Sequence, residues 1–208
     1  AKLRRYQELI ENQISKNNMN VLNMLNTKYF IVPSKEGQPV PRQNPDAAGN
    51  AWFVKEIKMV NNADEEMAAL TYFNPKDTVI VDKRFADYLK GINLVADSQM
   101  RIKLTEYQPN HLTYQSKSGS EQFAVFSEIY YNSGKGWLAY IDGKEAEHIR
   151  VDYVLRAMRI PAGEHKIEFK FYPKTFYTGE KISLAGSIIL LMGIFFVGYK
   201  ELKSKKEN

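Results

Sequence analysis

The sequence predicts a mainly β protein, in which an antiparallel β-sandwich or jelly-roll-like domain follows a small α+β part and precedes a C-terminal transmembrane helix. Two observations carry this prediction. From Gln99 onward, apolar and polar residues alternate with a period of two in six or seven short segments separated by turn residues. Residues 182–199 form an uncharged apolar run that is long enough to enter a bilayer.

Residues 1–26 are predicted to form an N-terminal helical connector. Apolar residues recur at helical spacing from Leu3 to Ile14, a polar break follows at Lys16–Asn18, and a second apolar turn covers Val21–Leu25. Such a stripe needs a partner surface, which either the β-domain or the membrane surface would supply.

Residues 27–98 are predicted to be a mixed α/β part of the same outer domain. Asn62 and the acidic residues after it are typical of a helix start, because an Asn side chain caps free N–H groups and acids favour the first turn. The other expected elements are a strand at 29–32, a long Pro- and Gly-rich loop at 33–50, single strands at 51–60 and 78–81, and a helical turn before Gly91.

Residues 99–178 are predicted to form the sandwich itself. Turn signals divide this stretch into short strands, and they fall at Pro109-Asn110, Ser118-Gly119, Gly134-Lys135-Gly136, Asp142-Gly143 and Pro161–Gly163. Within it, we expect Arg156 and Arg159 to form structural ion pairs with Asp152 or Glu128.

Residues 179–199 are predicted to cross the membrane, and residues 200–208 to form a cytoplasmic basic tail. The uncharged run of 18 residues would be roughly 27 Å long as a helix, close to the ~30 Å hydrocarbon layer. Lysines follow it directly, so the positive-inside bias predicts that residues 1–181 lie on the outer face of a bacterial cytoplasmic membrane. The alternative, a buried core helix, is disfavoured because the run has aromatic flanks and no polar face.

Composition excludes several classes of function. The chain has no cysteine, so disulfides, thiolate metal sites and thiol nucleophiles are absent, and its three histidines lack metal-ligand spacing. No phosphate-binding or nucleophile motif is present, so we expect no metal and no cofactor. The net charge of +5 is partly due to the C-terminal tail, which argues against nucleic acid as a partner. No export signal is visible at Ala1, so we expect upstream transmembrane segments to translocate the domain.

The densest group of functional side chains lies between residues 126 and 143. If two strands joined by a glycine-rich turn form a hairpin here, they place Glu128, Tyr130, Tyr140 and Asp142 on one face and Trp137 on the other. Aromatic rings near carboxylates stack on sugars and accept their hydroxyl hydrogens, so these five residues are the candidate glycan-binding site. In the alternative interpretation, Trp137 and Tyr131 are core residues and Asp142-Gly143 is a tight turn. Glu128 and Asp142 also satisfy the loose spacing of a glycosidase pair, as most acid-bearing strand pairs do.

The order of several segments resembles the C-terminal outer region of the YfhO-type bacterial multi-pass membrane proteins. No single segment is diagnostic, but their order and spacing are moderately specific, and they cover nearly the whole chain. The matching segments are residues 21–31, 49–54, 126–131, Gly136-Trp137, Asp142-Gly143, 153–157 and 160–169, followed by the last apolar helix.

The resemblance implies a parent protein similar to C-type glycosyltransferases, which use polyprenyl-phosphate-linked sugars to modify cell-envelope glycans or lipids. In those enzymes the catalytic acid lies in an early outer loop that this sequence does not contain, so no catalytic residue is carried over. The expected role is an accessory domain that positions a glycan or polyprenyl-linked acceptor or stabilises the membrane bundle. The alternatives are a non-catalytic structural, assembly or glycan-binding module and an independent anchored hydrolase.

Overall fold

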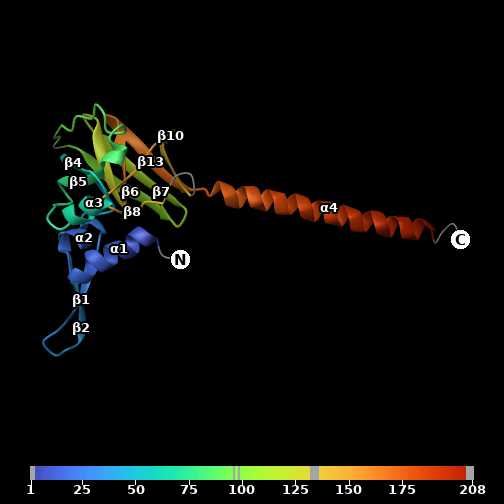
Figure 1. Cartoon of the computed structure of the whole chain (residues 1–208), viewed down its shortest axis with the longest axis horizontal. Helices are drawn as coiled ribbons and strands as arrows, with labels where there is room; N and C mark the ends of the chain where they lie inside the picture. Colours follow the sequence, from blue (N-terminus) through green and yellow to red (C-terminus); the bar gives the residue numbers. More distant parts are fainter. Residues whose placement is uncertain (1–2, 96, 98, 132–135, 205–208) are drawn as a thin grey trace.

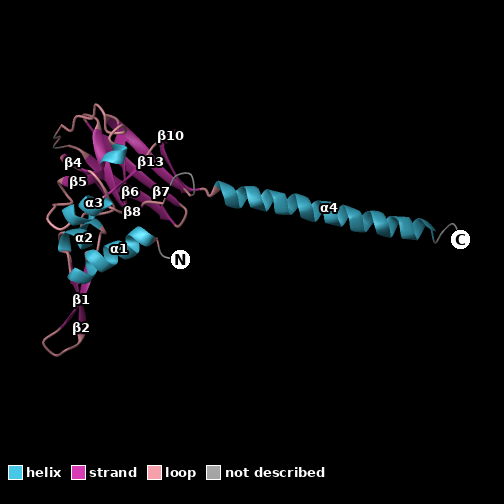
Figure 2. Ribbon diagram, in the orientation of Figure 1, coloured by secondary structure: helices cyan, strands magenta, loops and turns pink. Residues whose placement is uncertain are grey.

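Two antiparallel sheets stacked face to face form the centre of the computed structural model, which describes residues 3–95, 97, 99–131 and 136–204 (Figure 2). The five-stranded sheet has the order β10-β9-β13-β7-β6, with β6 at Arg101–Gln108, β7 at His111–Ser118, β9 at Trp137–Ile141, β10 at Lys144–Ala146 and β13 at Gly163–Phe171. The four-stranded sheet has the order β11-β12-β8-β3, with β3 at Ala51–Phe53, β8 at Gln122–Ile129, β11 at Ile149–Val151 and β12 at Leu155–Ile160. The predicted mainly β, antiparallel fold is confirmed.

Aromatic rings fill the space between the two sheets. Phe126 of β8 meets Tyr114 of β7 edge to face with 4.9 Å between ring centroids, and it meets Phe169 of β13 in the same way at 4.8 Å. All three side chains are almost fully buried. Edge-to-face pairs of this kind add to the stabilisation that comes from burying apolar area.

An α/β layer covers the other face of the four-stranded sheet (Figure 1). It contains α1 at Arg4–Asn12, the short 3-10 helix η1 at Ile14–Lys16, α2 at Met19–Met24, β4 at Glu56–Val60, α3 at Ala63–Ala69, β5 at Thr78–Asp82 and the 3-10 turn η2 at Lys83–Phe85. Strands β4 and β5 pair in parallel, with α3 as their connection. Because both faces of the four-stranded sheet are covered, β8 and β12 are buried along most of their length.

The helix start expected at Asn62 is present, and Asn18 caps a second helix in the same way. Asn62 accepts hydrogen bonds from the backbone N–H groups of Asp64 and Glu65 at the start of α3. Asn18 does the same for Asn20 and Val21 at the start of α2, after the polar break that separates α2 from α1. Both caps satisfy N–H groups that have no partner within their own helix.

Two expected elements differ in the structure. Residues 51–60 are not one strand, because the backbone N–H of Val54 still bonds to the four-stranded sheet at Phe123, whereas the next N–H, of Lys55, bonds to Asp77. The expected loop at 33–50 contains β2 at Pro39–Gln43, which pairs with β1 at Tyr29–Pro33. Proline lacks an N–H group and is tolerated here because a two-stranded ribbon consists only of edge strands.

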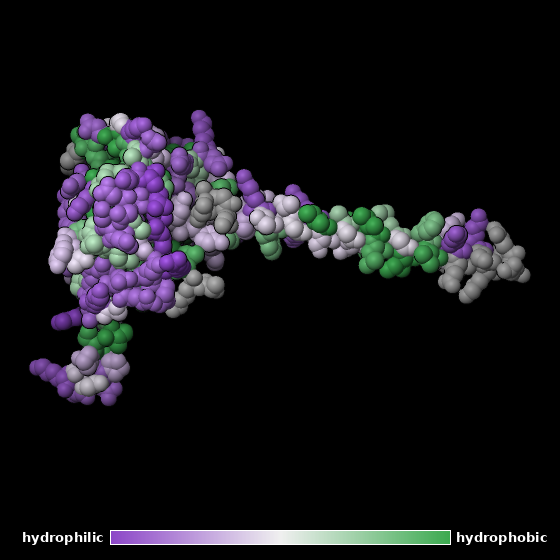
Figure 3. All heavy atoms as spheres, in the orientation of Figure 1, coloured by the Kyte–Doolittle hydropathy of each residue, from purple (hydrophilic) through white to green (hydrophobic). Residues whose placement is uncertain are grey.

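The apolar C-terminal run forms α4 at Lys174–Ser204, which projects away from the rest of the protein (Figure 1). Its middle is covered by hydrophobic side chains (Figure 3). Within the described residues, α4 is the one helix that is long and apolar enough to cross a membrane, and none of its apolar window is buried against the protein. The part of the predicted glycine-rich turn at 132–135 lies outside the described residues.

Candidate functional site

The expected hairpin of β8 and β9 is wrong, because the two strands lie in different sheets. Strand β8 instead pairs with β12 and β3, and β9 pairs with β13 and β10. The five candidate residues therefore do not share one face. The sequence pattern could not show this, since adjacent strands of a sandwich often pair with partners that are distant in the chain.

Glu128 and Trp137 lie near Arg156, a buried arginine of β12 that is only 2% exposed. The Arg156 Nε donates to the carbonyl oxygen of Ile129 at 3.1 Å, and its guanidinium carbon lies 4.4 Å from the centre of the Trp137 ring. Burial raises the pKa of Glu128, against the effect of the Arg156 charge. Trp137 packs at the edge of the sandwich core, so this group stabilises the contact between the sheets.

Tyr130 belongs to the same region through its contact with His148, at 5.4 Å between ring centroids. Burial and the Arg156 charge lower the pKa of His148 to about 4, so the imidazole is neutral at physiological pH. A histidine that stays neutral and packs against Tyr130 is suited to a structural role rather than to acid–base catalysis.

Tyr140 and Asp142 lie elsewhere on the five-stranded sheet. The Tyr140 ring faces Lys170 of β13, with the Lys170 Nζ 5.0 Å from the ring centre. Asp142 occupies the β9–β10 turn with a left-handed φ of 51°, and Gly143 follows at 80°, which matches the tight Asp-Gly turn. The Asp142 carboxylate contacts His165 Nδ1 at 2.6 Å and accepts from the Lys166 backbone N–H at 2.9 Å.

The two arginines of β12 make different contacts from one another. Arg159 pairs with Glu121 at 2.8 Å, so an ion pair is present but its partner is neither Asp152 nor Glu128. Arg156 interacts electrostatically with Glu128, but among the described residues no salt bridge joins the two side chains, so the expected ion pair is not confirmed. Asp152 lies apart from both arginines and accepts from the Ile80 backbone N–H at 2.8 Å.

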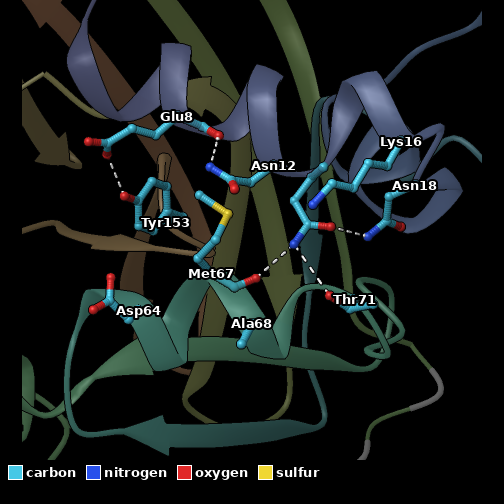
Figure 4. Close-up of a pocket in the computed structure, with 10 residues that line it drawn as sticks. Glu8, Asn12, Lys16, Asn18, Asp64, Met67, Ala68, Thr71 and Tyr153 are labelled. Atoms are coloured by element: carbon cyan, nitrogen blue, oxygen red, sulfur yellow. Dashed lines mark hydrogen bonds between the residues drawn. The ribbon is translucent and has the colours of Figure 1, made fainter.

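A polar groove that sequence analysis did not identify lies between α1 and α3 (Figure 4). Its volume is about 700 Å³. The residues that line it carry amides, carboxylates, an ammonium group, a hydroxyl and one phenol ring; they are Glu8, Asn12, Gln13, Lys16, Asn18, Asp64, Met67, Ala68, Thr71 and Tyr153.

Hydrogen bonds between the two helices fix one end of this groove. The Gln13 Nε2 donates to the Met67 carbonyl oxygen at 2.9 Å and to the Thr71 hydroxyl at 3.3 Å. The Asn18 Nδ2 donates to the Gln13 side-chain oxygen at 2.7 Å and to the Leu70 carbonyl at 2.9 Å. These amides are therefore occupied by structural bonds. Asn12 and Lys16 on the rim are exposed to solvent, and the Asn12 Nδ2 donates to the Glu8 carbonyl oxygen at 2.9 Å (Figure 4).

Tyr153 reaches the groove from a strained turn between β11 and β12. Asp152 and Tyr153 both have left-handed backbones, with φ values of 45° and 69°, which residues other than glycine rarely adopt. The buried Glu66 carboxylate holds the turn by accepting the Tyr153 backbone N–H at 3.0 Å. The Tyr153 hydroxyl then donates to Glu8 Oε2 at 2.5 Å across the groove.

This arrangement is suited to a neutral, polyhydroxylated ligand. Asp64 offers acceptors, and Lys16 and the second N–H of the Asn12 amide offer donors. Met67 and Ala68 offer a small apolar surface. The Tyr153 ring is only 6% exposed and lies under the Arg5 guanidinium, so it helps to shape the groove and does not present a face to a ligand. Among the described residues there is no group of three or more His, Cys, Asp or Glu side chains that could hold a metal ion. Sequence analysis missed the groove because its residues come from three distant segments, although the polar break after α1 was visible.

The structure combines a β-sandwich body with one exposed apolar helix that is a candidate membrane span. Comparison with known families agrees, because the family model described as "Bacterial membrane protein YfhO" matches residues 73–183, more than half of the chain. The chain belongs to the YfhO family of bacterial membrane proteins. No curated protein and no solved structure matches it. The matched region includes the whole sandwich except β3, whereas α1 and α3 precede it.

Proposed function

We propose that this chain is the extracytoplasmic accessory domain and terminal anchor of a membrane protein that resembles glycosyltransferases, and that it positions a saccharide acceptor. The observation that carries the proposal is the groove between α1 and α3, where exposed hydrogen-bonding groups lie beside the apolar side chains of Met67 and Ala68. Sugars present hydroxyl groups and apolar C–H faces, and this lining complements both.

Two features of the fold support a positioning role. The groove is rigid before any ligand arrives, because the interhelical amide bonds and the Glu66–Tyr153 bond set its shape. A preformed site loses less conformational entropy on binding. In addition, α1 begins on the side of the body from which α4 projects (Figure 1), so an anchor there restricts the orientation of the groove.

The direction of the anchor follows from its charges. Lysines at 200, 203, 205 and 206 follow the apolar run, and such residues are retained on the cytoplasmic side. In our proposal the sandwich and the groove therefore lie outside the cytoplasm, where cell-envelope glycans are assembled.

Glycan titration of the full chain in lipid nanodiscs tests the acceptor role. Saturation-transfer NMR with cell-envelope oligosaccharides is expected to show binding that weakens at least tenfold in Asn12→Ala and Lys16→Ala. The matched controls, Asn93→Ala and Lys35→Ala, remove an exposed amide and an exposed ammonium group outside the groove and are expected to bind normally. Absence of binding, or equal binding by all four variants, would contradict the proposal.

A structural or assembly role is the second candidate, and a specific observation favours it. Three of the five residues first considered for glycan binding, Glu128, Tyr130 and Trp137, are partly buried and lie around Arg156 and His148. If the titration fails while substitutions in this group disrupt the assembled membrane protein, the structural role replaces the acceptor role.

A further inference from the structure

Two groups of aromatic side chains, joined through the consecutive residues Phe171 and Tyr172, lie where α4 leaves the sandwich. We call them together the aromatic collar, which consists of Tyr131, Trp137, Phe171, Tyr172, Phe176 and Tyr177. Ring centroids of Trp137 and Phe171 are 5.4 Å apart, those of Tyr131 and Phe171 are 6.5 Å apart, and Tyr172 stacks on Tyr177 at 4.3 Å. The collar thus connects the ends of three body segments to the first turn of α4.

The backbone beneath the collar is closely packed. A Cβ atom at Gly136 would lie 2.5 Å from the Phe171 ring and 2.8 Å from the Tyr131 ring, so only glycine fits there. The Gly136 carbonyl accepts the Tyr172 N–H at 2.7 Å, and the Asn110 carbonyl accepts the Phe171 N–H at 2.8 Å. These bonds hold the last residues before α4 against the body.

The collar is nevertheless open to solvent. Tyr131 is 37% exposed, Phe171 36%, Tyr172 43% and Phe176 64%. Contiguous exposed aromatic residues on a folded body indicate an interaction surface rather than a core. Tyrosine, tryptophan and phenylalanine beside a membrane helix have an evident partner, since amphipathic rings favour the boundary between lipid and water.

We infer that the aromatic collar rests in the headgroup layer of the phospholipid bilayer and holds the sandwich on the membrane surface. The occupant follows from continuity with α4, because Tyr177 and Phe176 precede the uncharged run at Ile182 by roughly 7 to 9 Å of helix. The headgroup layer on each side of the hydrocarbon is roughly 5–8 Å thick. Tyr177 therefore lies within this layer, and Phe176 lies at its outer edge.

The rest of the collar reaches the same level when α4 tilts. Transmembrane helices tilt by about 20° on average, and a tilt lowers one side of the attached body towards the lipid. Lys170 and Lys174 flank the collar, and their ammonium groups can contact lipid phosphates. Lys170 also pairs with Glu168, but its side chain is still 42% exposed. The competing arrangement is a body held away from the lipid on a free helical stalk.

Spin labelling distinguishes these arrangements, and a chain without cysteine is suited to it. Single cysteines are introduced in the full chain at Gln108, which lines a separate shallow hollow together with Phe171 and Tyr172, and at Tyr72, which is 94% exposed and far from α4 in sequence. The labelled chain is reconstituted into vesicles of phosphatidylethanolamine and phosphatidylglycerol that contain no other protein. Collision rates with oxygen and with a water-soluble nickel complex then report the depth of each label.

We expect the label at position 108 to be shielded from nickel at least threefold relative to the label at position 72. The double variant Tyr131→Ser/Tyr172→Ser is expected to abolish this shielding, whereas the matched variant Tyr29→Ser/Tyr72→Ser, measured with the label at position 108, is expected to retain it. Near-UV circular dichroism and the unfolding temperature confirm that both variants are folded. Equal nickel access at both positions would overturn the inference. Shielding in cell membranes but not in lipid vesicles would also overturn it, because the occupant would then be a protein.

Discussion

Glu66 of α3 accepts a hydrogen bond from the backbone N–H of Tyr153, at 3.0 Å, although 87 residues separate them. The Glu66 side chain is fully buried and also lies 3.3 Å from Arg5 and 3.5 Å from Arg150. One carboxylate thereby joins the α/β layer to the strained turn that brings Tyr153 into the groove. Burial raises the pKa of Glu66, whereas Arg150, the Tyr153 N–H and Arg5 act in the opposite direction because they favour the charged carboxylate. The buried carboxylate is therefore stabilised by these three groups together and not by one ion pair.

Removing this carboxylate is therefore expected to be costly. Glu66→Ala leaves the Tyr153 N–H and the Arg150 guanidinium without a buried acceptor, and we expect a loss of about 3–5 kcal/mol in the free energy of unfolding. Chemical denaturation followed by tryptophan fluorescence measures it. Glu11→Ala, at an exposed residue of α1, is the control and is expected to leave stability nearly unchanged. Equal effects of both changes would contradict this role.

Asp152 is expected to make stability depend on pH. Complete burial raises its pKa well above the ordinary 3.8, so the folded state holds the proton more tightly than the unfolded state does. Stability from this group is full below pH 3.8 and is lost as the pH rises from there towards the folded-state pKa. Asp152→Asn keeps an acceptor for the Ile80 N–H and suits a left-handed backbone.

The Asp152→Asn variant should therefore gain stability relative to the wild type between about pH 4 and pH 7. Thermal unfolding in detergent at several pH values measures the difference. A difference that stays constant across this range would show that Asp152 does not titrate in this way.

Arg156 is expected to be essential for packing between the sheets. Arg156→Ala removes a cation that lies over Trp137 and leaves Glu128 without its nearby positive charge, so we expect a loss of about 3–5 kcal/mol. The emission of Trp137 should shift to longer wavelength in a Trp52→Phe background. Arg4→Ala, at an exposed arginine that pairs only within α1, should change neither stability nor emission. An Arg156 variant of normal stability would contradict this account.

His165 and Asp142 form a pair whose contribution to stability is lost at both high and low pH. The Asp142 hydrogen bond raises the pKa of His165 above its ordinary 6.5, and the same bond lowers the pKa of Asp142. The stabilisation from His165 is full below pH 6.5 and is lost as the pH rises through the raised value, while that from Asp142 is lost below about pH 4. The pair therefore contributes most between those limits.

Asp142→Asn is expected to return the pKa of His165 towards 6.5. A pH titration of the His165 ring protons by NMR measures this change, with His111 as an internal reference. An unchanged His165 titration would show that the Asp142 carboxylate does not control it.

The sequence predicted the parts of this fold that depend on local pattern. The alternation after Gln99, the Asn62 cap and the apolar run at 182–199 each reflect forces that act over a few residues, and the corresponding elements are present. The pairing of β8 with β12 and β3 depended on contacts between distant segments, which one sequence does not display. For the same reason the hairpin platform was wrong, and the groove between α1 and α3 was not anticipated.

The central claim is that α4 spans the membrane with the sandwich outside the cytoplasm, and cysteine accessibility in intact bacteria tests it most directly. Single cysteines at Tyr72 and at Lys200 are treated with a membrane-impermeant maleimide before and after lysis. We predict that position 72 is labelled in intact cells and that position 200 is labelled only after lysis. Labelling of position 200 but not of position 72 in intact cells would contradict the account.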